Sequence, residues 1–287
     1  MAVAGARRLA HLGPRGTYTE AAAIAYDADA VLSPQPTVAA AVACVEAGEA
    51  DAAVCAIENS VEGGVTETLD QLLRDDFALS ISGEVVLPIR HALIGVAGID
   101  LAAVTAVYSH PQALAQCRER LRELVPNASA IAALSTASAI ERAIAEPGAL
   151  AIGSELAARL HDATVYARDI ADAPGNETRF IVLTADDHEP TGSDKTSIAF
   201  TTYHDRPGSL VDVLGQLSKR SLNMTRIESR PTREQLGTYV FLVDFEGHRA
   251  ASDVADALEA LAESTLELRV LGSYPRSQSP LSKGGDA

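Results

Sequence analysis

The stretch of the chain richest in chemical groups is residues 176–180, which place an amide, a carboxyl, a hydroxyl, a guanidinium and an aromatic ring in successive positions. Turn residues precede it and apolar residues follow it, so the cluster should lie where a loop becomes a strand. Arg179 offers a planar fork that suits a carboxylate, and Thr178 offers a hydroxyl that can donate or accept a hydrogen bond. Taken alone, the stretch is more typical of a polar loop cap that carries a surface arginine than of a functional site.

Further polar side chains follow three other predicted strands, which span residues 9–12, 52–57 and 104–108. These side chains are Thr17, Glu58, Asn59, Ser60, Ser109 and His110. Strand ends that lead into helix N-termini expose free N–H groups, and such places bind small anions. Two of the residues have plain structural alternatives, because Glu58 could cap a turn and His110 could serve only as a hydrogen-bonding partner.

The composition narrows the class of ligand and the compartment. The net charge of -16 argues against nucleic acid, so an anionic ligand would need a local cluster of positive groups. The 3 cysteines are odd in number and lack metal-site spacing, which predicts reduced thiols, no disulfide framework and no metal site. With no signal-peptide pattern and no membrane-spanning run, the sequence predicts a cytoplasmic protein.

The order of predicted elements indicates how these residues are positioned. Strands and helices alternate over residues 7–185, which is typical of an α/β fold with largely parallel sheets. The long span between the early strands and the strand that carries Thr178 predicts two lobes. The chain would cross into the second lobe near Leu87 and return near Asp172, and ligands favour such lobe boundaries.

The remainder of the chain has a different pattern. Residues 186–195 are polar, contain proline and glycine and show no periodicity, so they are predicted to form a linker. Residues 196–274 follow the order β-α-β-β-α-β, which is the ferredoxin-like split unit. Residues 275–287 have the composition of a disordered tail.

The chain resembles prephenate dehydratases that carry a C-terminal ACT regulatory domain, from about residue 9 to residue 274. Five catalytic stretches match in the correct order, and two regulatory stretches match as well. They are residues 13–20, 58–60, 109–112, 135–137 and 176–180, and then residues 207–211 and 227–231. The resemblance implies a catalytic part of two α/β lobes, like a type 2 periplasmic binding protein, joined to a βαββαβ ACT domain.

The resemblance also implies the reaction, which converts prephenate to phenylpyruvate, carbon dioxide and water on the route to phenylalanine. Aromatisation drives this reaction, so no metal, redox cofactor or other cofactor is expected. In the family the threonine that matches Thr178 is the residue most closely tied to catalysis, and we expect it to donate to the leaving hydroxyl. Arg179 is expected to clamp a carboxylate, and Glu58 is an alternative proton source. The expected substrate-binding residues are Thr17, Asn59, Ser60, Ser109, His110, Asn176 and Phe180.

In ACT domains of this family, phenylalanine binds between a glycine-containing turn and a Glu-Ser-Arg-Pro strand at a dimer interface. The matching residues are Gly208, Ser209, Leu210, Val211, Asn223, Glu228, Ser229, Arg230 and Pro231. The family commonly has alanine where Ser209 stands, and the extra hydroxyl bears on ligand preference. The resemblance thus implies L-phenylalanine as an effector and a homodimer or homotetramer built through the ACT domains.

Two rival functions remain open from the sequence. Arogenate dehydratase is the same chemistry on the aminated substrate, and nothing in the sequence excludes it. A non-catalytic amino-acid sensor could also combine a binding-protein-like body with an ACT domain, although retention of Thr178 and Arg179 argues against it. A fused chorismate mutase is not expected, because too few residues precede Leu9 to form a helical domain.

Overall fold

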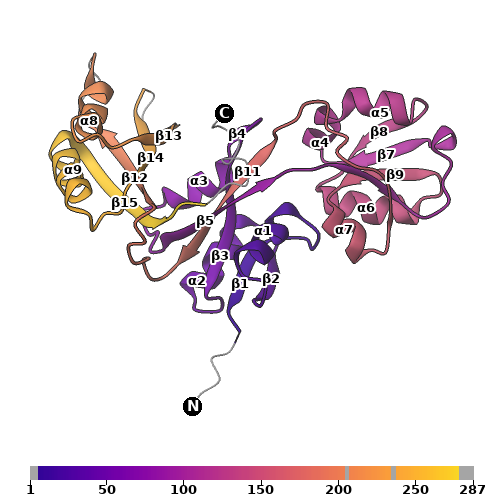
Figure 1. The fold of residues 1–287 in the computed structure, drawn as a ribbon, viewed down its shortest axis with the longest axis horizontal. Helices are drawn as coiled ribbons and strands as arrows, with labels where there is room; N and C mark the ends of the chain where they lie inside the picture. The colour runs from indigo at the N-terminus through magenta and orange to yellow at the C-terminus, as the bar shows by residue number, and fades with distance from the viewer. Residues whose placement is uncertain (1–5, 204–206, 234–236, 278–287) are drawn as a thin grey trace, which may run out of the picture.

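The chain folds around three β-sheets, which Figure 1 shows side by side along the length of the molecule. The computed structural model describes residues 6–203, 207–233 and 237–277. A six-stranded sheet lies in the middle, a five-stranded sheet lies at one end, and a four-stranded sheet lies at the other. Most of the predicted disordered tail lies outside the described residues, from position 278 onward.

The central sheet forms the first lobe and has the order β2-β1-β3-β11-β5, with β4 paired to β3. Its strands are β1 (Arg8–Leu12), β2 (Val31–Gln35), β3 (Ala52–Asn59), β4 (Gly63–Gly64), β5 (Ser80–Pro88) and β11 (Glu177–Thr184). The sheet is mixed rather than largely parallel, because β11 runs antiparallel to both β3 and β5. This direction follows from the path of the chain, which returns from the second lobe at the edge where β3 and β5 end.

The helices of the first lobe begin at the hydroxyl residues that the sequence indicated. They are α1 (Tyr18–Tyr26), α2 (Val38–Glu46) and α3 (Thr66–Leu72). The side chain of Thr17 caps α1 by accepting from the backbone N–H of Glu20 at 3.3 Å. The Glu20 carboxylate, in turn, accepts from the backbone N–H of Gly16. Strand β2 was not predicted from the sequence because it contains Pro34. The proline is tolerated because β2 lies at the edge of the sheet, where a missing backbone N–H breaks no hydrogen bond between strands.

The second lobe is the five-stranded sheet, with the order β10-β6-β9-β7-β8. Its strands are β6 (Ala92–Gly95), β7 (Ala106–Ser109), β8 (Ser129–Ala132), β9 (Ala149–Gly153) and β10 (Thr164–Ala167). Its helices are α4 (Pro111–Gln116), α5 (Arg118–Leu124), α6 (Thr136–Ala145) and α7 (Glu155–Leu160), with a short 3₁₀ turn at Leu101–Ala103. The sequence of residues 113–124 predicts a single helix, but the structure has two helices that meet at Cys117.

The third sheet has the order β13-β14-β12-β15, and every neighbouring pair is antiparallel. Its strands are β12 (Asp194–Thr202), β13 (Met224–Pro231), β14 (Tyr239–Glu246) and β15 (Thr265–Pro275), and its helices are α8 (Ser209–Ser218) and α9 (Ser252–Ser264). This βαββαβ unit, together with the two α/β lobes, confirms the expected fold class. Among the described residues, no helix is both long and apolar enough to cross a membrane.

The first lobe and the βαββαβ unit share one hydrophobic core. Leu242, Leu271 and Tyr274 from the third sheet belong to the same buried cluster as Ile81 and other apolar residues of the first lobe. The two bodies approach most closely at Gly272, where a Cβ atom would lie 2.2 Å from the backbone oxygen of Ile81. Only glycine allows β15 to lie this close to β5, so the contact is built into the backbone of both bodies.

This close approach predicts that Gly272→Ala lowers the free energy of unfolding. The added methyl group has to push β15 away from β5, and overpacking of this kind costs about 1–3 kcal/mol. Thermal or urea unfolding would measure the change. Gly215→Ala is the matched control, since a Cβ at Gly215 meets nothing within 4 Å. A Gly272→Ala protein as stable as the control would contradict the close contact.

Candidate functional site

Thr178 stands opposite Asn59 in the antiparallel pairing of β11 with β3. The amide nitrogen of Asn59 donates to Thr178 Oγ1 at 2.8 Å and to Asn176 Oδ1 at 2.7 Å. The amide oxygen of Asn59 accepts from the backbone N–H groups of Val61 and Glu62, both at 3.0 Å, and this fixes the orientation of the amide. Because the oxygen of Thr178 accepts from Asn59, the hydroxyl hydrogen can be donated to a further acceptor such as a substrate oxygen.

A chain of hydrogen bonds continues from this pair. Asn176 Nδ2 donates to Gln116 Oε1 at 2.9 Å, and His91 Nε2 lies 3.0 Å from the same oxygen. Tyr18 donates to the backbone oxygen of Arg90 at 2.7 Å, and its hydroxyl lies 3.3 Å from His91 Nδ1. Burial lowers the pKa of His91, so at neutral pH its imidazole is uncharged and donates from Nε2 to Gln116.

This chain of hydrogen bonds connects the two lobes. Tyr18 belongs to α1 of the first lobe, Gln116 ends α4 of the second, and His91 lies in the crossover between β5 and β6. A second contact joins the lobes where Ser154 Oγ donates to the backbone oxygen of Gly16 at 2.8 Å. Thr178 is therefore held at the junction of the lobes, where the sequence predicted a ligand to bind.

Three residues of this junction were not predicted from the sequence to belong to the site, and they are Tyr18, His91 and Gln116. His91 follows the predicted crossover near Leu87, and that position was the signal that could have identified it. Tyr18 lies within the matching stretch at residues 13–20, and that match could have identified it. Gln116 carries no such signal, because it lies within an ordinary helical stretch.

Two further predicted residues, Thr17 and Ser60, serve the backbone near the junction. Thr17 is half-buried, and its hydroxyl donates to the backbone oxygen of Leu12 at 3.2 Å. Ser60 is exposed; its hydroxyl accepts from the backbone N–H of Glu177 at 2.9 Å and donates to the oxygen of Gly175 at 3.2 Å. Ser60 thus fastens the start of β11 to the end of β3.

Three other predicted residues lie apart from the Asn59–Thr178 pair. Ser109 is buried, and its hydroxyl donates to the backbone oxygen of Ile152 within the second lobe at 2.9 Å. His110 is exposed, and its Nδ1 accepts from the backbone N–H of Gln112 at 3.4 Å at the start of α4. Phe180 is buried in the core of the first lobe, so its ring stabilises the sheet instead of facing a ligand. Within the described ranges, no group of three or more His, Cys, Asp and Glu side chains could hold a metal ion.

Arg179 and Glu58 lie on the opposite face of the sheet from Thr178 and Asn59. Successive side chains of a strand alternate between faces, so the register that pairs Thr178 with Asn59 also pairs Arg179 with Glu58 on the other side. The expected placement of Arg179 as a clamp beside Thr178 therefore differs from the structure. The Glu58 carboxylate likewise points toward Arg179, at 3.3 Å from its Nε, and away from the Thr178 hydroxyl.

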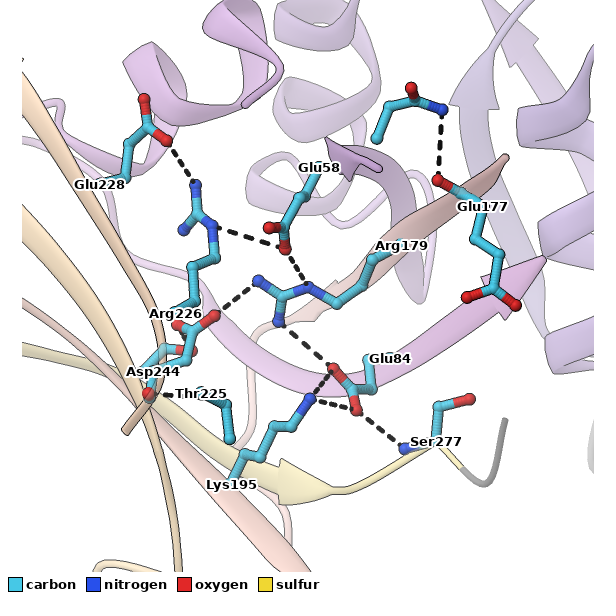
Figure 2. A network of polar contacts seen from close by, with 12 residues as sticks. Glu58, Glu84, Glu177, Arg179, Lys195, Thr225, Arg226, Glu228, Asp244 and Ser277 are labelled. Carbon is cyan, nitrogen blue, oxygen red and sulfur yellow. Dashed lines mark hydrogen bonds and ion pairs between the residues drawn. The ribbon is translucent and has the colours of Figure 1, made fainter. Parts of the chain in front are cut away.

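Figure 2 shows Arg179 at the centre of an ion-pair network between the first lobe and the third sheet. Its guanidinium lies 3.3 Å from Glu84 and 2.5 Å from Asp244, in addition to its contact with Glu58. Burial tends to lower the pKa of Arg179, whereas the surrounding acidic groups, Asp244 foremost, raise it above its ordinary value. The guanidinium is therefore fully charged and already neutralised by protein carboxylates.

Two protein-family models match the sequence of this chain. The model described as prephenate dehydratase matches residues 9–188, which contain both lobes, and the ACT domain model matches residues 197–263. The chain belongs to the prephenate dehydratase family. The Asn59–Thr178 pair and the hydrogen-bonded junction therefore lie within the prephenate dehydratase part, and Asp244 lies within the ACT domain.

Curated relatives and solved structures agree with this membership. The bifunctional chorismate mutase/prephenate dehydratase of Aquifex aeolicus is 42% identical over 271 residues, covering 94% of this chain and 74% of that protein. The prephenate dehydratase of Amycolatopsis methanolica is 38% identical over 275 residues, covering 94% of this chain and 89% of that protein.

Two solved structures superpose with equal TM-scores. The prephenate dehydratase from Arthrobacter aurescens in complex with L-Phe has a TM-score of 0.86 and 41% identity, covering 94% of this chain and 90% of that one. GqqA, described as a quorum quenching acylase, also has a TM-score of 0.86, with 32% identity over 95% of this chain and 99% of that one.

The hydrogen bonds around Thr178 predict that Asn59→Asp lowers turnover. A carboxylate can still accept from the Val61 and Glu62 N–H groups, but it would accept the Thr178 hydrogen instead of donating to the Thr178 oxygen. Losing a buried donor of this kind costs about 1–3 kcal/mol, so we expect kcat to fall about 10-fold to 100-fold. Steady-state kinetics would measure it, with the exposed Asn127→Asp as control. An Asn59→Asp enzyme with the kcat of the control would contradict the role of Asn59.

Proposed function

We propose that this chain carries out the decarboxylative dehydration of prephenate to phenylpyruvate, with Thr178 as the hydrogen-bond donor to the departing hydroxyl. The observation that supports the assignment is the Thr178 hydroxyl, which accepts from Asn59 and keeps its own hydrogen for the substrate at the junction of the lobes. Family membership supports the reaction, and the geometry supports the role of the residue.

The reaction requires little covalent chemistry from the protein. The bond between the ring and the carboxylate breaks, its electron pair moves through the ring diene, and the opposite carbon–oxygen bond breaks to release hydroxide. A proton converts that hydroxide to water, and the ring becomes aromatic. A donor aimed at the leaving oxygen stabilises the charge that develops there, and a site that sheds water favours loss of the carboxylate. No covalent nucleophile takes part in this sequence.

The positions of the other predicted site residues decide which of them we place against the substrate. Arg179 and Glu58 pair with each other on the far face of the sheet, so we do not place either against the substrate. Thr17, Ser60 and His110 remain proposed substrate contacts, because each is exposed or half-buried at a turn that follows a strand. Asn59 and Asn176 orient Thr178 and complete the proposed site.

The role of Thr178 predicts that Thr178→Ala loses turnover while substrate binding changes little. Removing one hydrogen-bond donor to a developing oxyanion costs about 100-fold or more in kcat, because the bond strengthens in the transition state. Thr178→Ser keeps the hydroxyl and should retain most of the activity. The ultraviolet absorbance of phenylpyruvate measures the rate on prephenate, and the formation of phenylalanine measures the rate on arogenate in a parallel assay. A Thr178→Ala enzyme with unchanged kcat would remove Thr178 from the mechanism.

We also propose that L-phenylalanine binds to the ACT domain and regulates the enzyme. A pocket of about 950 Å³ brings together the predicted turn at residues 208–211 and the predicted strand residues Arg230 and Pro231. Asp70 of α3 and residues 73–75, which follow this helix, line the same pocket, and Arg230 pairs with Asp70 at 3.0 Å. A ligand there would contact the catalytic part directly. Three of the predicted effector residues lie outside this lining: Asn223, Glu228 and Ser229.

An effector in this pocket predicts that Val211→Asp abolishes the response to L-phenylalanine. Val211 lines the pocket and is 71% exposed, so a carboxylate there should not disturb folding but should repel the carboxylate of the amino acid. Isothermal calorimetry and assays with added L-phenylalanine would measure binding and regulation. Val31→Asp, also at an exposed valine, serves as control. A Val211→Asp enzyme that binds L-phenylalanine as the control does would contradict the site.

Exposed side chains of the ACT domain support a proposal about how copies of this chain assemble, and the cysteines support one about its compartment. Large apolar side chains are exposed on it, and they are Tyr203, Val211, Met224, Ile227, Tyr239 and Leu266. Such a group of side chains on one domain favours pairing between copies, so we propose a homodimer or homotetramer built through the ACT domains in the cytoplasm. The cysteines Cys44, Cys55 and Cys117 are free thiols, which fits a reducing compartment. A monomeric mass by light scattering would contradict the assembly.

A further inference from the structure

The strand that carries Thr178 is fastened, on its other face, to a residue of the ACT domain. Arg179 follows Thr178 in β11, and its Nη2 donates to Asp244 of β14 at 2.5 Å. Both side chains are buried, with exposed fractions of 8% for Arg179 and 2% for Asp244. A buried charge that loses its partner is costly, so this pair holds the two domains in one arrangement.

Asp244 is itself fixed within the ACT domain. Its second carboxylate oxygen accepts from Ser197 Oγ of β12 at 2.6 Å, and Ser197 Oγ lies 2.7 Å from the hydroxyl of Tyr274 on β15. Tyr274 is fully buried in the core that the two domains share. Asp244 therefore cannot follow a shift of Arg179 without a movement of the ACT sheet.

The backbone pairing near the start of β11 is regular on one side and irregular on the other. The pairing with β5 keeps its register from Glu177 to Val182, whereas the pairing with β3 changes register between Arg179 and Phe180, one residue beyond Thr178. An irregularity of this kind interrupts the ladder and lets side chains near it be re-aimed. On the β3 side, the orientation of Thr178 therefore depends on side-chain contacts, which are its own hydrogen bond with Asn59 and the contacts that hold the neighbouring Arg179.

Arg179 and Arg226 both contact Glu58, and Arg179 is the more firmly held of the two (Figure 2). Arg226 of β13 reaches Glu58 at 3.6 Å and Glu228 at 3.7 Å, and its two terminal nitrogens have no hydrogen-bond partner among the described residues. The Arg179–Asp244 contact is shorter and hydrogen-bonded, and charge-assisted bonds of this length are the strong ones. It is the shortest contact through which the ACT domain can fix β11, since the hydroxyl of Tyr274 lies 3.5 Å from Arg179 Nη1.

We propose that Asp244 is a positioning residue of the dehydratase site, which acts through Arg179 to align Thr178 with Asn59 across the domain boundary. The inference rests on the proposed role of Thr178. Without the carboxylate, Arg179 shifts toward Glu58 and Glu84, the start of β11 follows, and the Thr178 hydroxyl leaves its alignment. Turnover falls, while substrate contacts away from β11 keep their places.

The first test compares Asp244→Asn with Asp194→Asn. Asp194 is also a buried carboxylate of the ACT domain, but its partners are Thr191 and Gly192 and it does not contact Arg179. At a temperature where both variants are folded, we expect Asp244→Asn to lower kcat about fivefold or more with KM nearly unchanged. Asp194→Asn should keep the kcat of the parent. Equal effects of the two variants on kcat would overturn the proposal, because a loss of general stability would then explain both.

A double-mutant cycle tests the route through Arg179. If Asp244 acts only through Arg179, the kcat of Asp244→Asn combined with Arg179→Lys should be no lower than that of the more impaired single variant. Losses that multiply would mean that the two residues act independently and would overturn the proposal. If Asp244→Asn does not fold, Ser197→Ala is the alternative variant, because it removes one hydrogen bond to Asp244 and keeps the carboxylate. Ser197→Ala should also lower kcat, and an unchanged kcat would overturn the proposal.

The outcome for Thr178 separates this inference from the proposed function. A Thr178→Ala enzyme with normal turnover would contradict the role of Thr178 and, with it, the target of Asp244. An inactive Thr178→Ala enzyme beside a fully active Asp244→Asn enzyme would leave the proposed function standing and overturn the positioning role alone.

Discussion

A guanidinium buried among three carboxylates sets the arrangement of this molecule. Arg179 contacts Glu58 of β3, Glu84 of β5 and Asp244 of β14, and so joins two strands of the catalytic lobe to one strand of the ACT domain. Such a charge is tolerated inside a protein only when its partners converge on it, because its own desolvation is costly. The shared apolar core that contains Ile81 and Tyr274 lies against this network, since the Tyr274 hydroxyl is 3.5 Å from Arg179 Nη1.

Because successive side chains alternate between the two faces of β11, this strand has two functional faces. Thr178 and Asn59 meet on the face toward the lobe junction, and Arg179 and Glu58 meet on the face toward the ACT domain. The residue that we assign to chemistry and the residue that fastens the regulatory domain are thus neighbours in the chain. Because Arg179 and Thr178 are adjacent in β11, a movement of the ACT domain that shifts Arg179 also shifts the proposed donor, Thr178.

Much of the fold could be predicted from local patterns, and the misses have local causes. Helix α2 begins after its predicted cap Thr37, which accepts from the N–H of Ala40, and the βαββαβ order of the ACT domain was read directly from the sequence. The edge strand β2 was not predicted because it contains Pro34, a residue that is unfavourable in most strands. The division of the helix at Cys117 was not predicted because the apolar residues keep a helical spacing across this position. The direction of β11 depends on the path of the whole chain, so the sequence predicted the strand but not its antiparallel pairing.

For the candidate site, the sequence by itself determined the motifs, the family that they indicate and the placement of Thr178 at the start of a strand. It also implied that Thr178 and Arg179 point to opposite faces, since that alternation is a property of any strand. Only the tertiary structure decided which face meets the ACT domain. The partners that settle the question, Glu84 and Asp244, lie 95 and 65 positions from Arg179, and a local pattern cannot show a charge pair formed over such distances.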